Sequence, residues 1–286
     1  CTVQPPTAPI AAAPPTVAAP VPPIPSLRLA PEIERGELMQ GGWLIGKASA
    51  DTVSIAYDSE TAVPDGDGRF FIGFDRDAPQ EVALSVRYAD GSERSVPLTL
   101  ATGIWALQHI NAPYRGSASS DAEFERLRDG ELAQIVAARD ISTSATGWRQ
   151  SFIWPAEGRI SGWFGAQRVY QGKPGPYHGG LDIAKPTGTP FVAPADGTVI
   201  LAASNPFTLE GYLLMIDHGD GLNSAFLHCS EILVREGDRV KQGQTIGKIG
   251  ATGRTTGPHL HWGVKWRDAR IDPLLLLGRP DLQSGN

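Results

Sequence analysis

Hydrophobic and polar residues alternate in short runs over most of the chain, a pattern that is typical of half-buried β-strands. Turn-forming residues separate these runs at regular intervals in the first part of the chain, which predicts a small antiparallel β-sandwich over residues 27–112. Residues 151–280 repeat the pattern between Gly-rich junctions and are predicted to be a second β domain. The runs in the first part lie at 42–48, 52–58, 68–74, 81–88 and 94–101.

Three segments depart from this alternation. Residues 1–26 are almost entirely Pro, Ala, Thr and Val, so we expect an extended, disordered tether there. Residues 113–150 are predicted to contain a connecting helix, because Ser120 and Glu123 have the spacing of a capping box. The expected apolar face of this helix consists of Phe124, Leu127, Ile135 and Val136. Which neighbouring domain the helix packs on is left open. The third segment, residues 281–286, is a short tail.

Composition excludes some functions and suggests a location. The net charge of −6 and the absence of any basic run argue against nucleic-acid binding. No run of about 20 apolar residues is present, so no membrane-spanning helix is expected.

A chain that begins with Cys1 and continues into a Pro/Ala tether resembles a mature bacterial lipoprotein. This predicts a lipid on Cys1 and a place on the periplasmic side of the envelope, and Thr2 favours the outer membrane.

Two segments of the second β domain are similar to the flat β-sandwich of lipoyl and biotinyl carrier domains. They are "VAPADGTVILAA" at 192–203 and "REGDRVKQGQTIGKIG" at 235–250. Carrier domains attach their cofactor to a lysine at a hairpin tip, but Lys185 precedes a proline and has no methionine beside it. We therefore expect only the scaffold, a barrel-sandwich hybrid. The predicted fold class is mostly β, with this domain, the N-terminal sandwich and the connecting helix.

The histidines of the second β domain follow strand periodicity. In "GPHLHWGV" (257–264), His259 and His261 share one face of a strand, while Leu260 and Trp262 point to the core. In "SAFLHCS", the same alternation places His228 on one face with Phe226. Cys229 then lies on the opposite face with Leu227, which makes this thiol a poor candidate for a ligand.

His178 and Asp182 are spaced H-x-x-x-D in "YHGGLDIA". Gly179 and Gly180 argue against a helix, so we expect a turn there followed by a strand from Leu181. Several imidazoles and one carboxylate are typical of a catalytic zinc site, in which three protein ligands leave a position for water. Peptide hydrolysis also needs a base and a donor to the developing oxyanion. The five candidate groups are His178, Asp182, His228, His259 and His261.

These motifs, in this order, resemble the lysostaphin/LytM-type zinc endopeptidases of bacterial cell walls over residues 151–280. The resemblance implies one zinc ion per chain, held by His178, Asp182 and His261. It also implies catalytic roles for His228 and His259, without deciding which is the base. Tyr177 is a candidate substrate-binding residue. The motifs are "SGWFG", "YHGGLDIA", "APADGTV", "IDHGDG", "GDRVKQGQ" and "ATGRTTGPHLHW".

The resemblance implies hydrolysis of peptide cross-links of peptidoglycan, with the D-alanyl–meso-diaminopimelate bond as the expected target. The expected partners are peptidoglycan stem peptides and the membrane, through the lipid, and a regulatory protein is left open. The alternative is a non-catalytic LytM-like adaptor that activates a cell-wall amidase. Such adaptors lack the metal residues, so the intact set of five favours the enzyme.

Overall fold

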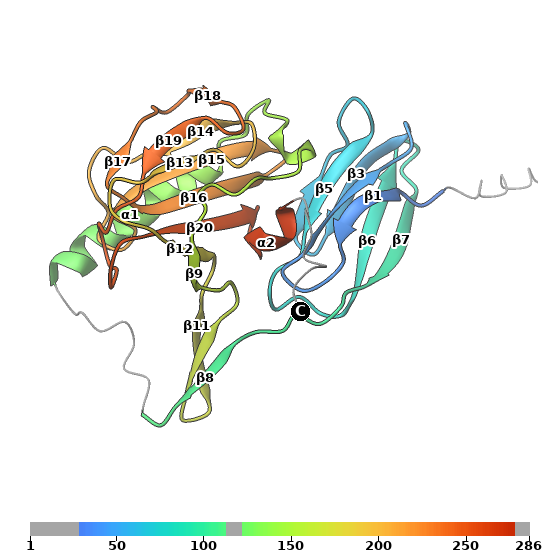
Figure 1. The fold of residues 1–286 in the computed structure, drawn as a ribbon. Coiled ribbons are helices and arrows are strands. Elements are labelled where there is room, and N and C mark those ends of the chain that lie inside the picture. The colour runs from blue at the N-terminus through green and yellow to red at the C-terminus, as the bar shows by residue number, and fades with distance from the viewer. Residues whose placement is uncertain (1–28, 113–121, 278–286) are drawn as a thin grey trace, which may run out of the picture.

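The computed structural model describes residues 29–112 and 122–277, which consist mostly of β-strands (Figure 1). The mostly β fold class is confirmed, whereas the more specific barrel-sandwich assignment stays a prediction. The expected tether, Cys1, Ser120 with the Glu123 side chain, and the 281–286 tail lie outside the described residues. Within the described part, no helix has both the length and the apolar character needed to cross a membrane.

The N-terminal strands form two antiparallel sheets, ordered β1-β2-β5 and β4-β3-β6-β7. Five strands follow the predicted runs. Two further strands were not predicted: β1, where charged residues interrupt the apolar pattern, and β4, which has only three residues. The bounds are β1 Glu32–Glu37, β2 Trp43–Lys47, β3 Thr52–Tyr57, β4 Glu60–Ala62, β5 Arg69–Gly73, β6 Glu81–Tyr88 and β7 Glu93–Thr99.

The C-terminal part is built on an eight-stranded sheet with the order β18-β14-β15-β16-β20-β12-β9, and β21 pairs with β20. A three-stranded sheet, β13-β19-β17, packs against it, and the rings of Phe191 and Phe226 lie 5.2 Å apart in the shared core. The bounds are β9 Arg159–Gly162, β12 Leu181–Ala184, β13 Pro190–Val192, β14 Gly197–Ala202, β15 Tyr212–Gly219, β16 Leu222–Cys229, β17 Glu231–Ile232, β18 Arg239–Val240, β19 Thr245–Lys248, β20 His259–Trp266 and β21 Ala269–Ile271.

The two β domains share one hydrophobic core. The side chain of Trp43 stacks on Phe71, and its indole N–H donates to the Leu275 carbonyl at 2.8 Å. Gly73 in β5 has no room for a side chain, because a Cβ there would lie 2.7 Å from Cβ of Trp266 in β20. The N-terminal sandwich is therefore packed directly on the C-terminal sheet.

A further three-stranded sheet projects from the C-terminal part (Figure 1). It has the order β11-β10-β8, with β8 Leu107–Ile110, β10 Gln167–Tyr170 and β11 Lys173–Tyr177. Residues 107–110 were expected in the first β domain, but β8 runs parallel to β10 of the second. A run of four residues carries no local signal for so distant a partner.

Helix α1, Ala122–Arg139, packs on the eight-stranded sheet and not on the N-terminal sandwich. The expected apolar face is partly wrong. Ile135 and Ala138 are buried against the sheet, whereas Leu127 and Val136 are exposed. The helix is turned so that Arg128 makes two hydrogen bonds to the buried Glu210, at 2.6 and 2.8 Å. Two short helices complete the chain: the 3-10 helix Gly147–Arg149 and α2, Pro273–Leu276.

Candidate metal centre

Three predicted ligands converge on one point. The Oδ1 atom of Asp182 lies 2.8 Å from Nδ1 of His261 and 3.1 Å from Nε2 of His178. The same two histidine nitrogens lie 3.1 Å apart. Each of the three side chains therefore offers an atom to a common position, and a metal ion could bind there.

Strand pairing accounts for this convergence. In the antiparallel pair β12/β20, Asp182 lies directly opposite His261, so their side chains share a face. His178 follows the end of β11 and turns towards them through Gly179 and Gly180, as predicted, before β12 begins at Leu181.

Two glycines make room for the ligands. A Cβ on Gly162 of β9 would clash with the Asp182 carboxylate. A Cβ on Gly180 would lie 2.7 Å from Nε2 of His261. Gly180 was expected only as part of the turn before β12, and Gly162 was not singled out, although both glycines lie inside the motifs "SGWFG" and "YHGGLDIA".

A backbone carbonyl orients the imidazole of His178 from outside the site. Nδ1 of His178 lies 3.0 Å from the Trp163 carbonyl, so the neutral imidazole donates outward from Nδ1 and keeps an Nε2 lone pair that a metal ion can use. An outer hydrogen bond of this kind fixes the tautomer of a metal-binding histidine. The chemistry of the donor set, two nitrogens and one carboxylate oxygen, fits zinc.

His259 and His228 stand beside the three ligand candidates. Nε2 of His259 lies 3.6 Å from Oδ1 of Asp182, and the rings of His228 and His259 are 4.9 Å apart. Nδ1 of His259 lies 2.9 Å from the Gly257 carbonyl, and Nδ1 of His228 lies 2.9 Å from the Thr252 carbonyl. When neutral, each ring therefore donates from Nδ1 and keeps Nε2 as a proton acceptor.

The predicted alternation holds in β20 but fails in β16. His259 and His261 face the site, and Leu260 and Trp262 are fully buried on the other face. In β16, by contrast, Phe226 is in the core and does not share a face with His228.

The backbone of His228 explains the failure in β16. Its φ angle is +63°, in the left-handed region that a non-glycine residue rarely adopts. Its N–H donates to the Glu210 carbonyl at 2.8 Å, which holds this conformation and sends the ring to the site. Cys229 stays buried in the core, with its thiol donating to the Phe226 carbonyl.

Burial and the Asp182 carboxylate set the charges of the site. Burial opposes ionisation of Asp182, but hydrogen bonds from His178 and His261 outweigh this and hold the pKa of Asp182 well below its ordinary value. For His178, burial is outweighed by Asp182, which raises the histidine's pKa. Burial lowers the pKa of His261, and it lowers the pKa of His228 to about 4. His228 is therefore a neutral imidazole at neutral pH.

Tyr177 lies next to the site, but its hydroxyl is engaged elsewhere. It donates to the Asp75 carboxylate of the N-terminal sandwich at 3.2 Å. The guanidinium groups of Arg76 and Arg270 lie 4.7 and 5.2 Å from the centre of its ring. A substrate-binding role for Tyr177 stays a prediction, and in this structure its visible role is to join the two domains.

The two remaining histidines of the described residues lie away from the centre. His218 is fully buried, and its nitrogens bond the Asp196 carbonyl at 2.8 Å and Ser224 Oγ at 2.9 Å. His109 is exposed in β8. The predicted lipidation residue, Cys1, lies outside the described residues.

Comparisons with known proteins identify a family for part of the chain. Residues 176–273 match the model of peptidase family M23. The "Peptidoglycan DD-endopeptidase ShyB" of Vibrio cholerae is 42% identical over 97 residues, which are 34% of this chain and 22% of that protein. The "Murein hydrolase activator NlpD" of Salmonella dublin is 38% identical over 196 residues, 68% of this chain and 45% of that protein. The matched regions thus span less than half of these curated relatives.

A solved structure is similar over both β domains. It is a putative M23 peptidase from Pseudomonas aeruginosa, with a TM-score of 0.65 and 28% sequence identity. The match covers 84% of this chain and 95% of that one. The likeness therefore extends to the N-terminal sandwich as well as to the domain with the histidines.

Proposed function

We propose, from the premise that residues 176–273 form a domain of peptidase family M23, that this chain is a zinc-dependent endopeptidase acting on peptide cross-links of peptidoglycan. The observation that carries the proposal is the convergence of three ligand candidates with two further imidazoles in one place. The five groups are His178, Asp182, His261, His228 and His259.

Three residues would hold the metal, namely His178, Asp182 and His261. Zinc at such a site supplies a Lewis acid that polarises the peptide carbonyl and makes a bound water more acidic. The chain's own part is to present these atoms in fixed orientation. The Trp163 carbonyl holds His178, and the strand register holds Asp182 opposite His261.

Two residues would handle protons, His228 and His259. Each keeps Nε2 free of hydrogen when neutral, because its Nδ1–H donates to a backbone carbonyl. One imidazole can take a proton from the attacking water and pass it to the leaving amine. The other, once protonated, can stabilise the negative charge on the carbonyl oxygen. Which residue has which role is left open.

The target bond proposed is the amide between D-alanine and meso-diaminopimelate. The name of the Vibrio cholerae relative, a DD-endopeptidase of peptidoglycan, supports a bond between two D-configured centres. We propose the cell envelope as the place of action, in line with the relatives named for peptidoglycan and murein. The lipid on Cys1 and outer-membrane anchoring stay predictions.

A second function has an observation of its own. The NlpD relative, named an activator of murein hydrolases, matches more of this chain than the endopeptidase relative does. The alternative is therefore a chain that activates an amidase without cutting. The complete set of five groups argues for the enzyme, because an activator needs neither a base nor metal ligands.

Isolated peptidoglycan sacculi test the proposal. The purified full chain is supplied with zinc and incubated with sacculi, and the fragments are identified by mass spectrometry. We expect cross-linked dimers to decrease, and new D-alanyl carboxyl ends and diaminopimelate amines to appear. Asp182→Asn serves as the matched control that keeps the shape of the ligand. Intact cross-links, together with faster amidase action when an amidase is added, would support the activator instead.

A further inference from the structure

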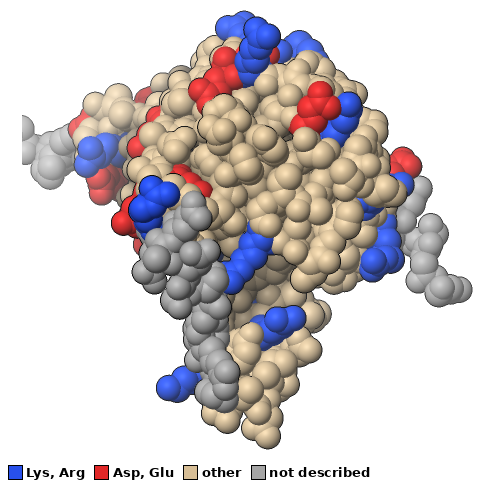
Figure 2. Space-filling view, turned by 90° about the vertical axis from the view of Figure 1, so that its left-hand side faces the viewer, with Lys and Arg blue, Asp and Glu red and all other residues tan. Residues whose placement is uncertain are grey.

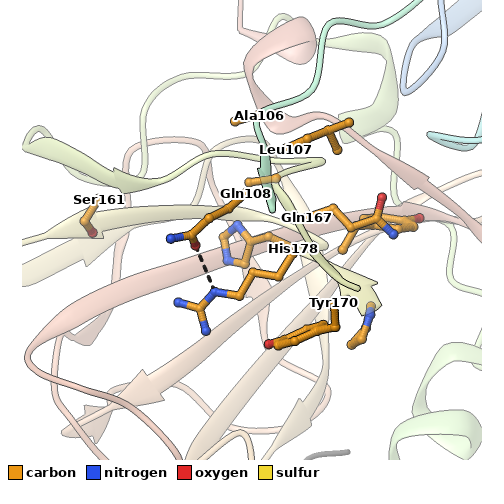
Figure 3. A pocket seen from close by; sticks show the side chains of 11 residues that line it. Ala106, Leu107, Gln108, Ser161, Gln167, Tyr170 and His178 are labelled. Carbon is orange, nitrogen blue, oxygen red and sulfur yellow. Dashed lines mark hydrogen bonds between the residues drawn. The ribbon is translucent and has the colours of Figure 1, made fainter. Parts of the chain in front are cut away.

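A pocket of about 680 Å³ adjoins the candidate metal ligand His178 (Figure 3). Figure 3 shows the side chains of Gln108 and Tyr170 around the same space as His178. Gln108 belongs to β8 and Tyr170 to β10, so the wall of the pocket is the small β11-β10-β8 sheet. A substrate that reaches the metal ligands has this pocket beside it.

The pocket lies largely outside the part that matches the family model. That match begins at residue 176, whereas most lining residues precede it, in β8, β9 and β10. The segment that matches the family model therefore supplies only a minority of the residues that line the pocket.

The wall is firmly fixed to the N-terminal sandwich. The buried guanidinium of Arg76 donates to the Gly165 carbonyl at 3.1 Å and to Oε1 of Gln167 at 3.0 Å. It also lies 5.4 Å from the ring centre of Trp105, two residues before β8. A side chain on Gly165 would clash with the Trp105 ring, so the segment leading into β8 is closely packed. The pocket is thus a built feature with a defined shape.

One cationic group faces this pocket. Arg168 in β10 is the only Lys, Arg, Asp or Glu among the lining residues. Its Nε donates to Oε1 of Gln108, its partner in the parallel register, at 3.1 Å (dashed line in Figure 3). Within the described residues, Arg168 has no ion pair with a carboxylate. Its guanidinium is oriented by Gln108 and still has donors for another group.

The sheet that carries Arg168 has no acidic residue of its own. The segments that make up the sheet, 107–110 and 167–177, contain Arg168 and Lys173 but no Asp or Glu. The whole chain has a net charge of −6, so this basic surface runs against the overall composition. In Figure 2, the lower projection bears Lys and Arg but no Asp or Glu in view. A basic wall of this kind attracts an anionic ligand.

We propose that this pocket binds the free carboxylate next to the scissile amide, with Arg168 as the residue that recognises it. The inference rests on the proposed function. In a D-alanyl–meso-diaminopimelate cross-link, the amide nitrogen is attached to a carbon that also carries a free carboxylate. That carboxylate is two bonds from the nitrogen, so it must lie close to the metal ligands during cleavage. A guanidinium matches a carboxylate with two parallel hydrogen bonds.

This assignment makes the pocket a specificity determinant. A cross-link whose carboxylate is amidated would lack the charge that Arg168 binds, and it would be cleaved more slowly. Gln108 would act as a positioning residue, because its amide oxygen holds the guanidinium plane. Neutral glycan has no group that needs Arg168, so glycan binding would not depend on this residue.

Two soluble cross-linked dimers test the proposal, one with a free carboxylate on diaminopimelate and one with the amide. The measurement is kcat/KM for each dimer with zinc-loaded full-length chain. The wild type is expected to prefer the free carboxylate about tenfold, the order of a charge-assisted hydrogen bond. In R168Q the preference is expected to approach one, and R168K keeps part of it. R239Q is the matched control. It replaces an exposed arginine in β18, at the edge of the eight-stranded sheet opposite β9, and is expected to keep the wild-type preference.

The result that overturns the proposal is an R168Q variant that retains the wild-type preference, or one that loses activity equally on both dimers. Equilibrium binding of the same two dimers separates this inference from the proposed function. If the wild type cuts neither dimer but binds the carboxylate form more tightly through Arg168, the subsite stands and the hydrolase proposal fails. If binding shows no preference either, the subsite is wrong.

Discussion

The strand pair that carries the ligand candidates, called the floor here, and the wall of the pocket beside His178 are built in different ways. The floor is the pair β12/β20, where the ligands come from short motifs and their facing follows from strand alternation and register. The wall is the β11-β10-β8 sheet, which depends on contacts between residues far apart in sequence, such as Arg76 with Gly165 and Gln167. The ligand residues of the floor are thus specified by local sequence, whereas the shape of the pocket beside them is specified by long-range packing.

The strongest test of this contrast is removal of one ligand on the floor. Asp182→Asn removes the only anionic group of the ligand set, so we expect zinc affinity to fall by about 100-fold or more and cross-link cleavage to disappear. Zinc per chain after dialysis, measured by mass spectrometry, checks this. His109→Ala on the wall is the control and should bind zinc like the wild type. Equal zinc retention by both variants would refute the ligand assignment.

Next in size are the imidazoles that do not hold the metal. His259→Ala and His228→Ala are each expected to lower the cleavage rate by about 10²–10⁴-fold, the usual contribution of a general acid–base group, while zinc is largely retained. Turnover and bound zinc should be measured on the same preparation. If either variant digests sacculi at the parent rate, that histidine has no catalytic role.

Breaking the wall is expected to change stability more than chemistry. Arg76→Met leaves the Gly165 carbonyl and the Gln167 amide oxygen without their buried donor, so the free energy of unfolding should fall by about 2 kcal/mol. Urea denaturation measures it. Arg87→Met, on the exposed side of β6, is the matched control and should change the free energy by less than about 0.5 kcal/mol. An unchanged denaturation midpoint in Arg76→Met would mean that the wall does not depend on this residue.

The smallest expected effect is a pH dependence of the free energy of unfolding, which arises at the contact between the two domains. Burial raises the pKa of Asp220, whose carboxylate accepts a hydrogen bond from the Phe71 N–H, to about 7. Between about pH 4 and 7 the folded chain keeps a proton that the unfolded chain releases, so this group makes the free energy of unfolding fall as pH rises.

Asp220→Asn cannot ionise and removes that slope. The variant should equal the wild type near pH 4 and exceed it by about 1 kcal/mol near pH 8. His218, whose pKa burial lowers to about 4, has the opposite slope but cancels in the difference. Urea denaturation of both proteins across this range checks the sign. A variant that is less stable near pH 8 would contradict it.

Most of the floor could be predicted from the sequence, because strand periodicity is a local property. His259 and His261 face the site, and the turn before Leu181 was expected from two glycines. His228 reaches the site as well, but by another route. Its positive φ angle breaks the alternation, and a carbonyl eighteen residues earlier, that of Glu210, holds it there. No local pattern reports such a backbone conformation.

The wall could not be predicted, and the reason is also physical. The pairing of β8 with β10 joins residues about 60 positions apart, and nothing in the four residues of β8 specifies that partner. The rotation of α1 about its axis could not be predicted either: Arg128 pairs with Glu210, Ile135 is buried, and Val136 is exposed although its spacing suggested burial. The two glycines beside the ligands were visible in the motifs, but their role follows only from the side chains that fill their space.

The most direct test of the account measures zinc content and cleavage together. Metal-free full-length chain is titrated with zinc, and the conversion of a cross-linked dimer to monomers is recorded at each step. We expect the rate to rise in proportion to bound zinc and to stop rising at about one ion per chain, the stoichiometry of a single three-ligand site. Cleavage without metal, or a chain with one bound zinc that leaves the dimer intact, would contradict it.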